Sequence, residues 1–161
     1  MQLPEPQDEH RWLLQLVGEW DYQHECNMGP DQPPMKSSGK QTTRALGELW
    51  VLGDIAGTTP GGSEVRSVIT LGFDPAKARF VGTFVSSCMT HLWPYDGSLD
   101  ASGKVLTLDS EGPSFAGDGS MAKYQDIIEV IDNDHHTMKS QFQNADGTWT
   151  QFMHGTYQRC P

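Results

Sequence analysis

Apolar and polar residues alternate along much of the chain after residue 18. The alternation is strict in residues 18–26, where the larger side chains of one face are Trp20, Tyr22, His24 and Cys26, opposite acids and glutamine. Residues 64–74 repeat this two-residue period. Such a period is typical of a β-strand with one buried face and one face in water.

Turn signals separate these alternating segments. The runs DASGK at 100–104, DNDHH at 132–136 and NADGT at 144–148 are rich in Asp, Asn and Gly, which favour tight connections between strands. Many short strands at such spacing predict a sandwich or a barrel, and a meander protects its edges best by closing on itself. We therefore predict an all-β fold, an antiparallel up-and-down β-barrel of about ten strands forming a single domain over residues 1–161.

One segment before the strands has the period of a helix. Its apolar side chains gather on one side, and Asp8 and Glu9 lie near its start, where the helix dipole favours acids. Gly18 follows the last periodic residue and can end the helix. We predict a short helix over Glu5–Leu16 that lies over a barrel mouth or one wall.

The charge balance restricts the partners. The chain has 21 acidic against 11 basic residues, a formal net charge of −10, and no basic stripe with interleaved aromatic residues. Phosphates would repel such a surface, so we expect no nucleic-acid partner and no binding to anionic membranes.

The sequence says less about the cellular location and the oligomeric state. No apolar run approaches the roughly 20 residues that cross a bilayer, and the N-terminal residues lack the basic and long apolar regions of a signal peptide. The odd count of three cysteines does not suggest a disulfide framework. We expect a cytoplasmic protein, and the sequence leaves a homodimer open.

Several motifs together resemble a known family. They are LVGEWDY at 16–22, the segment 70–87, the segment 89–113 and KYQDIIEVIDNDHHT at 123–137. In content and order they are similar to a bacterial family known as domain of unknown function 1579. The resemblance implies a lipocalin-like, calycin-type barrel with no established reaction and no assigned catalytic residues. A more distant similarity, a G-x-W strand after a short helix, is to nitrobindin-type haem barrels, whose glycine-rich opening this chain lacks.

Residues 88–95, CMTHLWPY, contain the densest group of candidate ligand contacts. In an extended strand His91, Trp93 and Tyr95 share one face, an amphipathic set suited to a mainly apolar ligand with one polar group. Pro94 predicts a bulge or a sheet edge here, and a bulge would turn Tyr95 outward. We expect Trp20 and Tyr22 to line the same interior, with Arg44 and His91 holding the polar end of the ligand.

The remaining histidines have different expectations. His154 is the candidate axial ligand if the barrel binds haem, with a barrel-wall histidine as the alternative. His24 alternates with aromatic residues and is expected inside. We expect His135 and His136 in solvent because they fall in a turn signal, and His10 exposed on the helix.

Metal and nucleophile motifs are missing from the sequence. There is no paired CxxC, no HExxH and no G-x-S-x-G elbow. We therefore expect no structural metal, no cofactor and no nucleophilic serine, and we expect Cys88 to be an inert thiol.

Three functions remain open at this stage. The first is binding of a small, mainly apolar molecule inside the barrel. The second is an enzyme in which His91 or Tyr95 performs acid–base chemistry, and the third is a packed barrel used for assembly. A lone histidine among apolar walls would favour binding, whereas a histidine hydrogen-bonded to an acid or a tyrosine would favour chemistry.

Overall fold

A computed structural model describes residues 1–59 and 61–161. Helix α1 (Asp8–Leu14) precedes ten strands. The strands are β1 (Gly18–Cys26), β2 (Met35–Leu46), β3 (Trp50–Thr58), β4 (Glu64–Asp74), β5 (Arg79–Ser86), β6 (Trp93–Leu99), β7 (Val105–Pro113), β8 (Met121–Asp132), β9 (His135–Gln143) and β10 (Trp149–Arg159).

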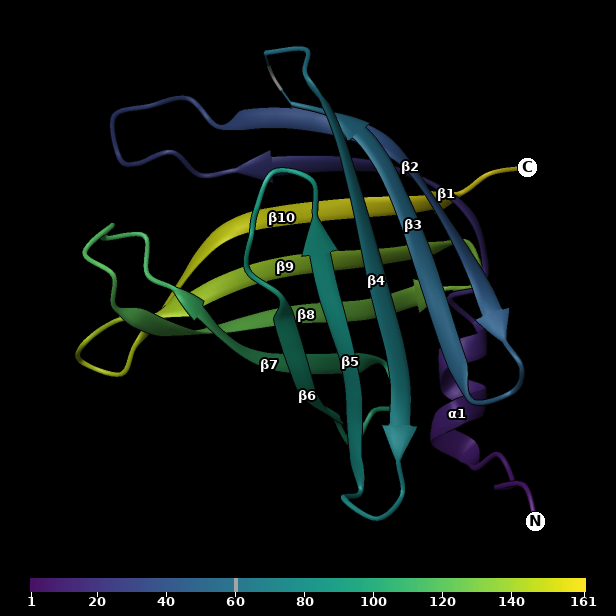
Figure 1. Cartoon of the computed structure of the whole chain (residues 1–161). Coiled ribbons are helices and arrows are strands. Elements are labelled where there is room, and N and C mark those ends of the chain that lie inside the picture. The colour runs from purple at the N-terminus through teal and green to yellow at the C-terminus, as the bar shows by residue number, and fades with distance from the viewer. Residues whose placement is uncertain (60) are drawn as a thin grey trace.

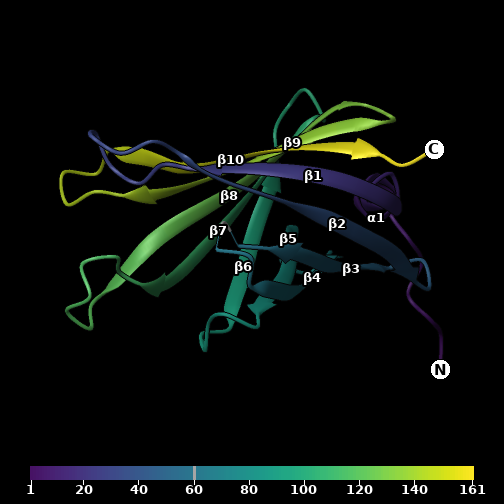
Figure 2. The same cartoon turned by 90° about the horizontal axis from the view of Figure 1, so that it is seen from above.

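The strands form a closed antiparallel barrel. Each strand pairs with its neighbours in the chain, and β1 pairs with β10, with Tyr22 opposite Tyr157. Figures 1 and 2 show β1 beside β10 and the strands following one another around the wall. The predicted up-and-down barrel is confirmed. Closure gives every strand of the described chain a pairing neighbour on each side, so the sheet has no free edge strand.

The inner face of the strands carries the core. The alternation expected for residues 18–26 is observed, since Trp20 and Tyr22 are buried and their neighbours in sequence are exposed. A second buried set fills the end of the barrel next to α1: Leu13, Leu16, Val51, Ile69, Leu71, Phe80, Tyr95, Leu106, Leu108 and Ile128.

Helix α1 is shorter than predicted and closes one end of the barrel (Figure 1). It begins at Asp8 rather than Glu5, because Pro4 and Pro6 keep the preceding residues extended. After Leu14 the chain tightens into turns with hydrogen bonds between residues three apart, so the α-helix ends before Leu16. The indole N–H of Trp12 donates to the carbonyl of Gly103 at 2.6 Å, which ties the helix to the turn between β6 and β7.

The expected exposure of His10 is wrong. Its side chain is 4% exposed, and its Nδ1 accepts a hydrogen bond from the backbone N–H of Gln7. Its Nε2 donates to the carbonyl of Phe73 at 3.0 Å, at the end of β4. His10 therefore fastens the start of the helix to the barrel wall, a role that a helical period does not reveal.

Within the described part of the chain, no helix is both long enough and apolar enough to cross a membrane.

Candidate ligand-binding site

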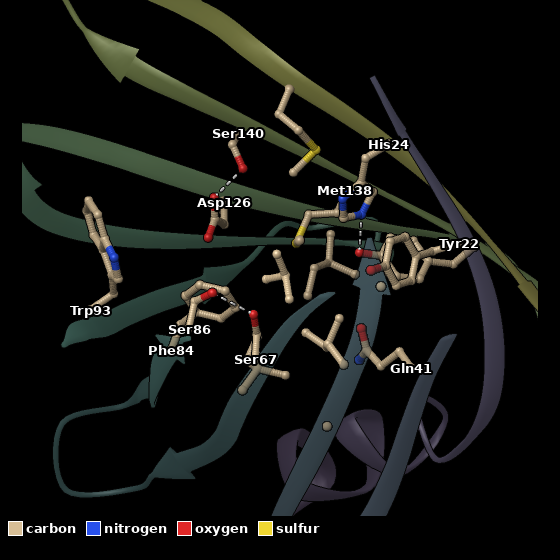
Figure 3. A pocket seen from close by; sticks show the side chains of 18 of the residues that line it. Tyr22, His24, Gln41, Ser67, Phe84, Ser86, Trp93, Asp126, Met138 and Ser140 are labelled. Atoms are coloured by element: carbon tan, nitrogen blue, oxygen red, sulfur yellow. Dashed lines mark hydrogen bonds between the residues drawn. The ribbon is translucent and has the colours of Figure 1, made fainter. Parts of the chain in front are cut away.

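A cavity of about 500 Å³ occupies the barrel interior (Figure 3). Side chains from all ten strands line it, and Leu16 after α1 contributes to its closed end. Its apolar wall includes Val51, Ile55, Ile69, Leu71, Phe84, Ile128, Met138, Phe152 and Met153. A volume of this size is typical of a small-molecule site.

The opposite end of the barrel, away from α1, carries apolar side chains at the cavity rim. Met89 before β6 and Phe115 after β7 line the cavity and are 42% and 67% exposed. The Phe115 ring lies edge-to-face against Tyr124, Phe142 and Phe152 at centroid distances of 5.0–5.7 Å. This aromatic group therefore lies at a solvent-exposed rim of the cavity.

A bulge in β10 places two consecutive side chains in the cavity. The pairing of β10 with β9 shifts between Gln151 and Met153, so both Phe152 and Met153 line the cavity. Beyond the bulge, His154 faces outward and is exposed. The haem alternative through His154 therefore does not fit this structure, because its imidazole lies outside the barrel.

Trp93 lines the cavity, and the strand face that carries it points inward as predicted. Its indole covers Gly112 on β7, and its Nε1 is buried with no hydrogen-bond partner among the described residues. Figure 3 shows the indole at one side of the cavity, with its nitrogen toward the interior. An unpaired buried N–H costs free energy, so an acceptor on a bound ligand would stabilise it.

We expect Gly112→Ala to destabilise the protein by about 1–3 kcal/mol, the usual cost of overpacking. An added Cβ would clash with Cζ3 of Trp93, so the indole must move. Urea unfolding measures the change. Gly61→Ala is the control, because the nearest described atom beyond its chain neighbours, Thr59 Oγ1, would lie 3.8 Å from the added Cβ, and we expect its midpoint to stay unchanged. Equal midpoints for both variants would contradict the close packing of the indole.

His91 does not line the cavity. Strand β6 begins at Trp93, so His91 lies in the preceding connection. Its Nε2 donates to the carbonyl of Glu111 at 2.9 Å, and its ring lies edge-on to Trp93 at 4.7 Å. His91 thus supports the indole from the side.

Tyr95 faces inward and is 6% exposed. Of the two alternatives expected at Pro94, a bulge or a sheet edge, the bulge is wrong. Pro94 is the second residue of β6 and pairs with Thr83 without a register shift. The pairing of β6 with β7 begins only at Asp96, as for a residue at a sheet edge, so the missing N–H of Pro94 removes no bond from that ladder. The Pro94 carbonyl accepts a hydrogen bond from Ser110 Oγ at 2.7 Å.

The other predicted contacts are divided between the two faces of the wall. Tyr22 lines the cavity. Trp20 lies on the same inner face of β1 but outside the cavity. Its indole N–H donates to the Leu16 carbonyl at 2.9 Å, and the Arg159 guanidinium lies 4.2 Å above its ring. Arg44 is exposed on the outer face of β2, so it does not join the cavity residues.

Tyr95, Asp126 and Ser140 form a polar group inside the barrel. The hydroxyls of Tyr95 and Ser140 each donate to a different oxygen of Asp126, both at 2.5 Å. All three residues line the cavity. Burial raises the pKa of Asp126, an effect that the hydrogen bonds from Ser140 and Tyr95 oppose. Burial and the neighbouring carboxylate raise the pKa of Tyr95 well above its usual value.

A second polar group joins His24, Tyr157 and His136. His24 Nε2 and Tyr157 Oη are 2.7 Å apart, and the rings of Tyr157 and His136 stack at 4.5 Å. His24 lies inside the barrel, as its alternation suggests, and its imidazole lies directly over Gly155. The expected solvation of His136 is wrong: it is 6% exposed, whereas His135 is exposed and bonds Asp132 at 2.8 Å.

Burial lowers the pKa of both interior histidines to about 4. The proximity of His154 adds to the effect on His24, and that of Arg159 adds to the effect on His136. Both imidazoles are therefore neutral at pH 7. His136 Nδ1 is buried without a hydrogen-bond partner in the part of the chain that the structure describes.

Metal-binding geometry is not evident. Residues 1–59 and 61–161 contain no group of three or more His, Cys, Asp or Glu side chains placed to hold a metal ion.

Comparison with known proteins identifies the family. The model of the family described as "Protein of unknown function (DUF1579)" matches residues 5–159. The chain belongs to this family. The resemblance noted in the sequence motifs is thus confirmed. No curated protein matches this DUF1579 chain in sequence.

Solved structures share the barrel of this DUF1579 protein at low sequence identity. Rv2717c from M. tuberculosis is 12% identical, with a TM-score of 0.67 over 98% of this chain and 100% of that one. The S-type phycobiliprotein lyase CPES from Guillardia theta is 12% identical, with a TM-score of 0.63 over 97% and 99%. EF1p2_mFAP2b, in a structure bound to DFHBI, is 14% identical, with a TM-score of 0.52 over 95% and 100%. These similarities show a common fold.

Sequence reasoning missed the polar residues of the cavity. Asp126 and Ser140 were not candidates, and neither were Tyr157 and His136 as lining residues. One signal was available: Tyr124, Asp126 and Ile128 alternate along one strand, which places an acid among inward-facing side chains. The sequence does not reveal the bond between Tyr95 and Asp126, because the two residues are 31 positions apart on strands that are not neighbours.

Proposed function

We propose that this protein binds a small, mainly apolar molecule inside the barrel. The observation that carries the proposal is the cavity of about 500 Å³, whose wall is mostly aliphatic, aromatic and sulfur-containing. An apolar body would bury its surface against this wall, and few polar groups would orient it. Tyr22, Trp93 and Tyr95 are the predicted contacts that lie in position to touch such a ligand.

The structural neighbours support the proposal at the level of the fold. The barrel of EF1p2_mFAP2b was solved bound to the small molecule DFHBI.

A cytoplasmic location remains our proposal, which the three free cysteines Cys26, Cys88 and Cys160 support.

Native mass spectrometry of the protein purified from its own host tests this function directly. A retained small molecule of mainly apolar composition is the expected result. Protein with no retained molecule, which also fails to bind apolar fluorescent probes, would contradict the proposal.

We expect Trp93→Ala to weaken binding of the apolar probe N-phenyl-1-naphthylamine about tenfold or more. Losing this aromatic wall removes about 1–3 kcal/mol of apolar contact. Fluorescence titration measures the Kd. Trp50→Ala is the matched control, because Trp50 is 39% exposed and does not line the cavity. Equal affinities for the two folded variants would show that the probe does not bind beside Trp93.

Acid–base catalysis is a second candidate, supported by the hydrogen bond between His24 and Tyr157. A neutral imidazole paired with a phenol on the cavity wall can move a proton to or from a bound molecule. This chemistry would fall to His24 and not to His91, which does not line the cavity, or to Tyr95, whose hydroxyl donates to Asp126. The test incubates the ligand recovered from the host with wild type and with His24→Gln, followed by liquid chromatography and mass spectrometry. Conversion by wild type alone supports catalysis, and an unchanged ligand in both supports binding.

A further inference from the structure

The charge on the cavity wall has one sign. Of the residues that line the cavity in the described chain, Asp126 is the one Asp or Glu, and none is Lys or Arg. The two interior histidines are neutral at pH 7 because burial lowers the pKa of each to about 4. Nothing on this wall would neutralise an anionic ligand head.

Asp126 lies among apolar and aromatic neighbours. It is on the inner face of β8 between Tyr124 and Ile128, both 6% exposed, and Figure 3 shows its carboxylate pointing into the barrel. An ionised carboxylate in such surroundings is costly unless a cation or several hydrogen bonds compensate it. No Lys, Arg or His of residues 1–59 or 61–161 lies within 4.0 Å of this carboxylate.

The carboxylate has accepting capacity left for a ligand. A carboxylate offers about four lone-pair sites, and Tyr95 and Ser140 occupy one on each oxygen. These two hydroxyls hold the side chain in place and are already committed as donors. The carboxylate can therefore receive donors from the cavity, while its two hydroxyl partners cannot donate to a ligand acceptor at the same time.

We propose that Asp126 selects ligands that combine an apolar body with a protonated amine. The ammonium group donates to the Asp126 carboxylate and supplies the cation that the wall lacks, and the body packs against the apolar and aromatic wall. The net charge of −10 also raises the local concentration of cations around the protein. This inference rests on the proposed function and specifies its ligand class.

Three probes with one aromatic body test the inference. They are 2-(2-naphthyl)ethylamine, 2-naphthylacetic acid and 2-(2-naphthyl)ethanol, titrated by isothermal calorimetry at pH 7.5. For wild type we expect the amine to bind at least tenfold more tightly than the acid. In Asp126→Asn we expect the amine to lose at least tenfold in affinity and the alcohol to change less than threefold.

Asp54→Asn is the matched control, since it removes the same charge from an exposed position on β3. We expect it to change all three affinities less than twofold. If Asp126→Asn does not fold, the ratio of the wild-type affinities for the amine and the acid still tests the inference.

Equal binding of amine and acid to wild type overturns the inference, as does an amine affinity that survives Asp126→Asn. In both cases binding of the alcohol leaves the proposed function standing. If none of the three probes binds wild type, the proposed function fails and this inference fails with it.

Discussion

Acidification from pH 6.5 to pH 4 is expected to lower the free energy of unfolding by up to about 3 kcal/mol for each of two buried histidines, His24 and His136. Burial lowers the pKa of both from 6.5 to about 4. Between these values the unfolded chain binds a proton that the folded barrel does not accept, so acid favours unfolding. Well above pH 6.5 both states are unprotonated at these positions and the effect vanishes.

Asp126 acts in the opposite direction. Its pKa is raised by burial, so in the window between its unfolded and folded pKa the folded state binds the extra proton, and acidification there stabilises the barrel. The two histidines outnumber this single group, and we expect net loss of stability as the pH falls.

Urea unfolding at several values between pH 7.5 and pH 4 measures the dependence. Whatever its stability at pH 7.5, we expect the free energy of unfolding of His136→Gln to depend less on pH than that of wild type. His135→Gln is the neighbouring control, because His135 is exposed beside Asp132, and we expect it to keep the slope. A His136→Gln variant that keeps the full wild-type dependence of stability on pH would contradict the burial of the His136 imidazole.

Leu13→Ala is expected to lower the free energy of unfolding by about 2–5 kcal/mol. Leu13 is 1% exposed, and it brings the apolar face of α1 into the core at the closed end of the barrel. Truncation removes three carbons there and leaves a void that the fixed barrel wall cannot fill. Urea or thermal unfolding measures the loss.

Leu3→Ala makes the same chemical change at a position that is 76% exposed, so we expect a change below about 0.5 kcal/mol. Similar losses in both variants would show that α1 does not close the barrel through Leu13.

Much of the fold followed from local patterns. The alternation in residues 18–26 predicted β1, whose buried residues include Trp20 and Tyr22 as expected. The helical period located α1 but not its ends, because the start is set by Pro6 and by the bond between Gln7 and His10. A one-residue irregularity is equally invisible: the bulge at Gln151–Met153 turned His154 outward, and no composition signal marks it.

The candidate site was predicted only in part. Trp93, Tyr95 and Tyr22 line the cavity, because strand alternation fixes the face of each once the strand is located. His91 does not, because β6 starts two residues after it. The adjacent His135 and His136 have opposite environments, since consecutive residues of β9 point to opposite faces.

The sequence by itself determined the strands, their number to within one or two, the helix and the family. These depend on side-chain periods of a few residues and on turn chemistry, which are local properties of the chain. Only the tertiary structure decided which polar groups meet inside the barrel. The bond between Tyr95 and Asp126 spans 31 positions and that between His24 and Tyr157 spans 133, and both exist because closure of the barrel brings distant strands around one cavity.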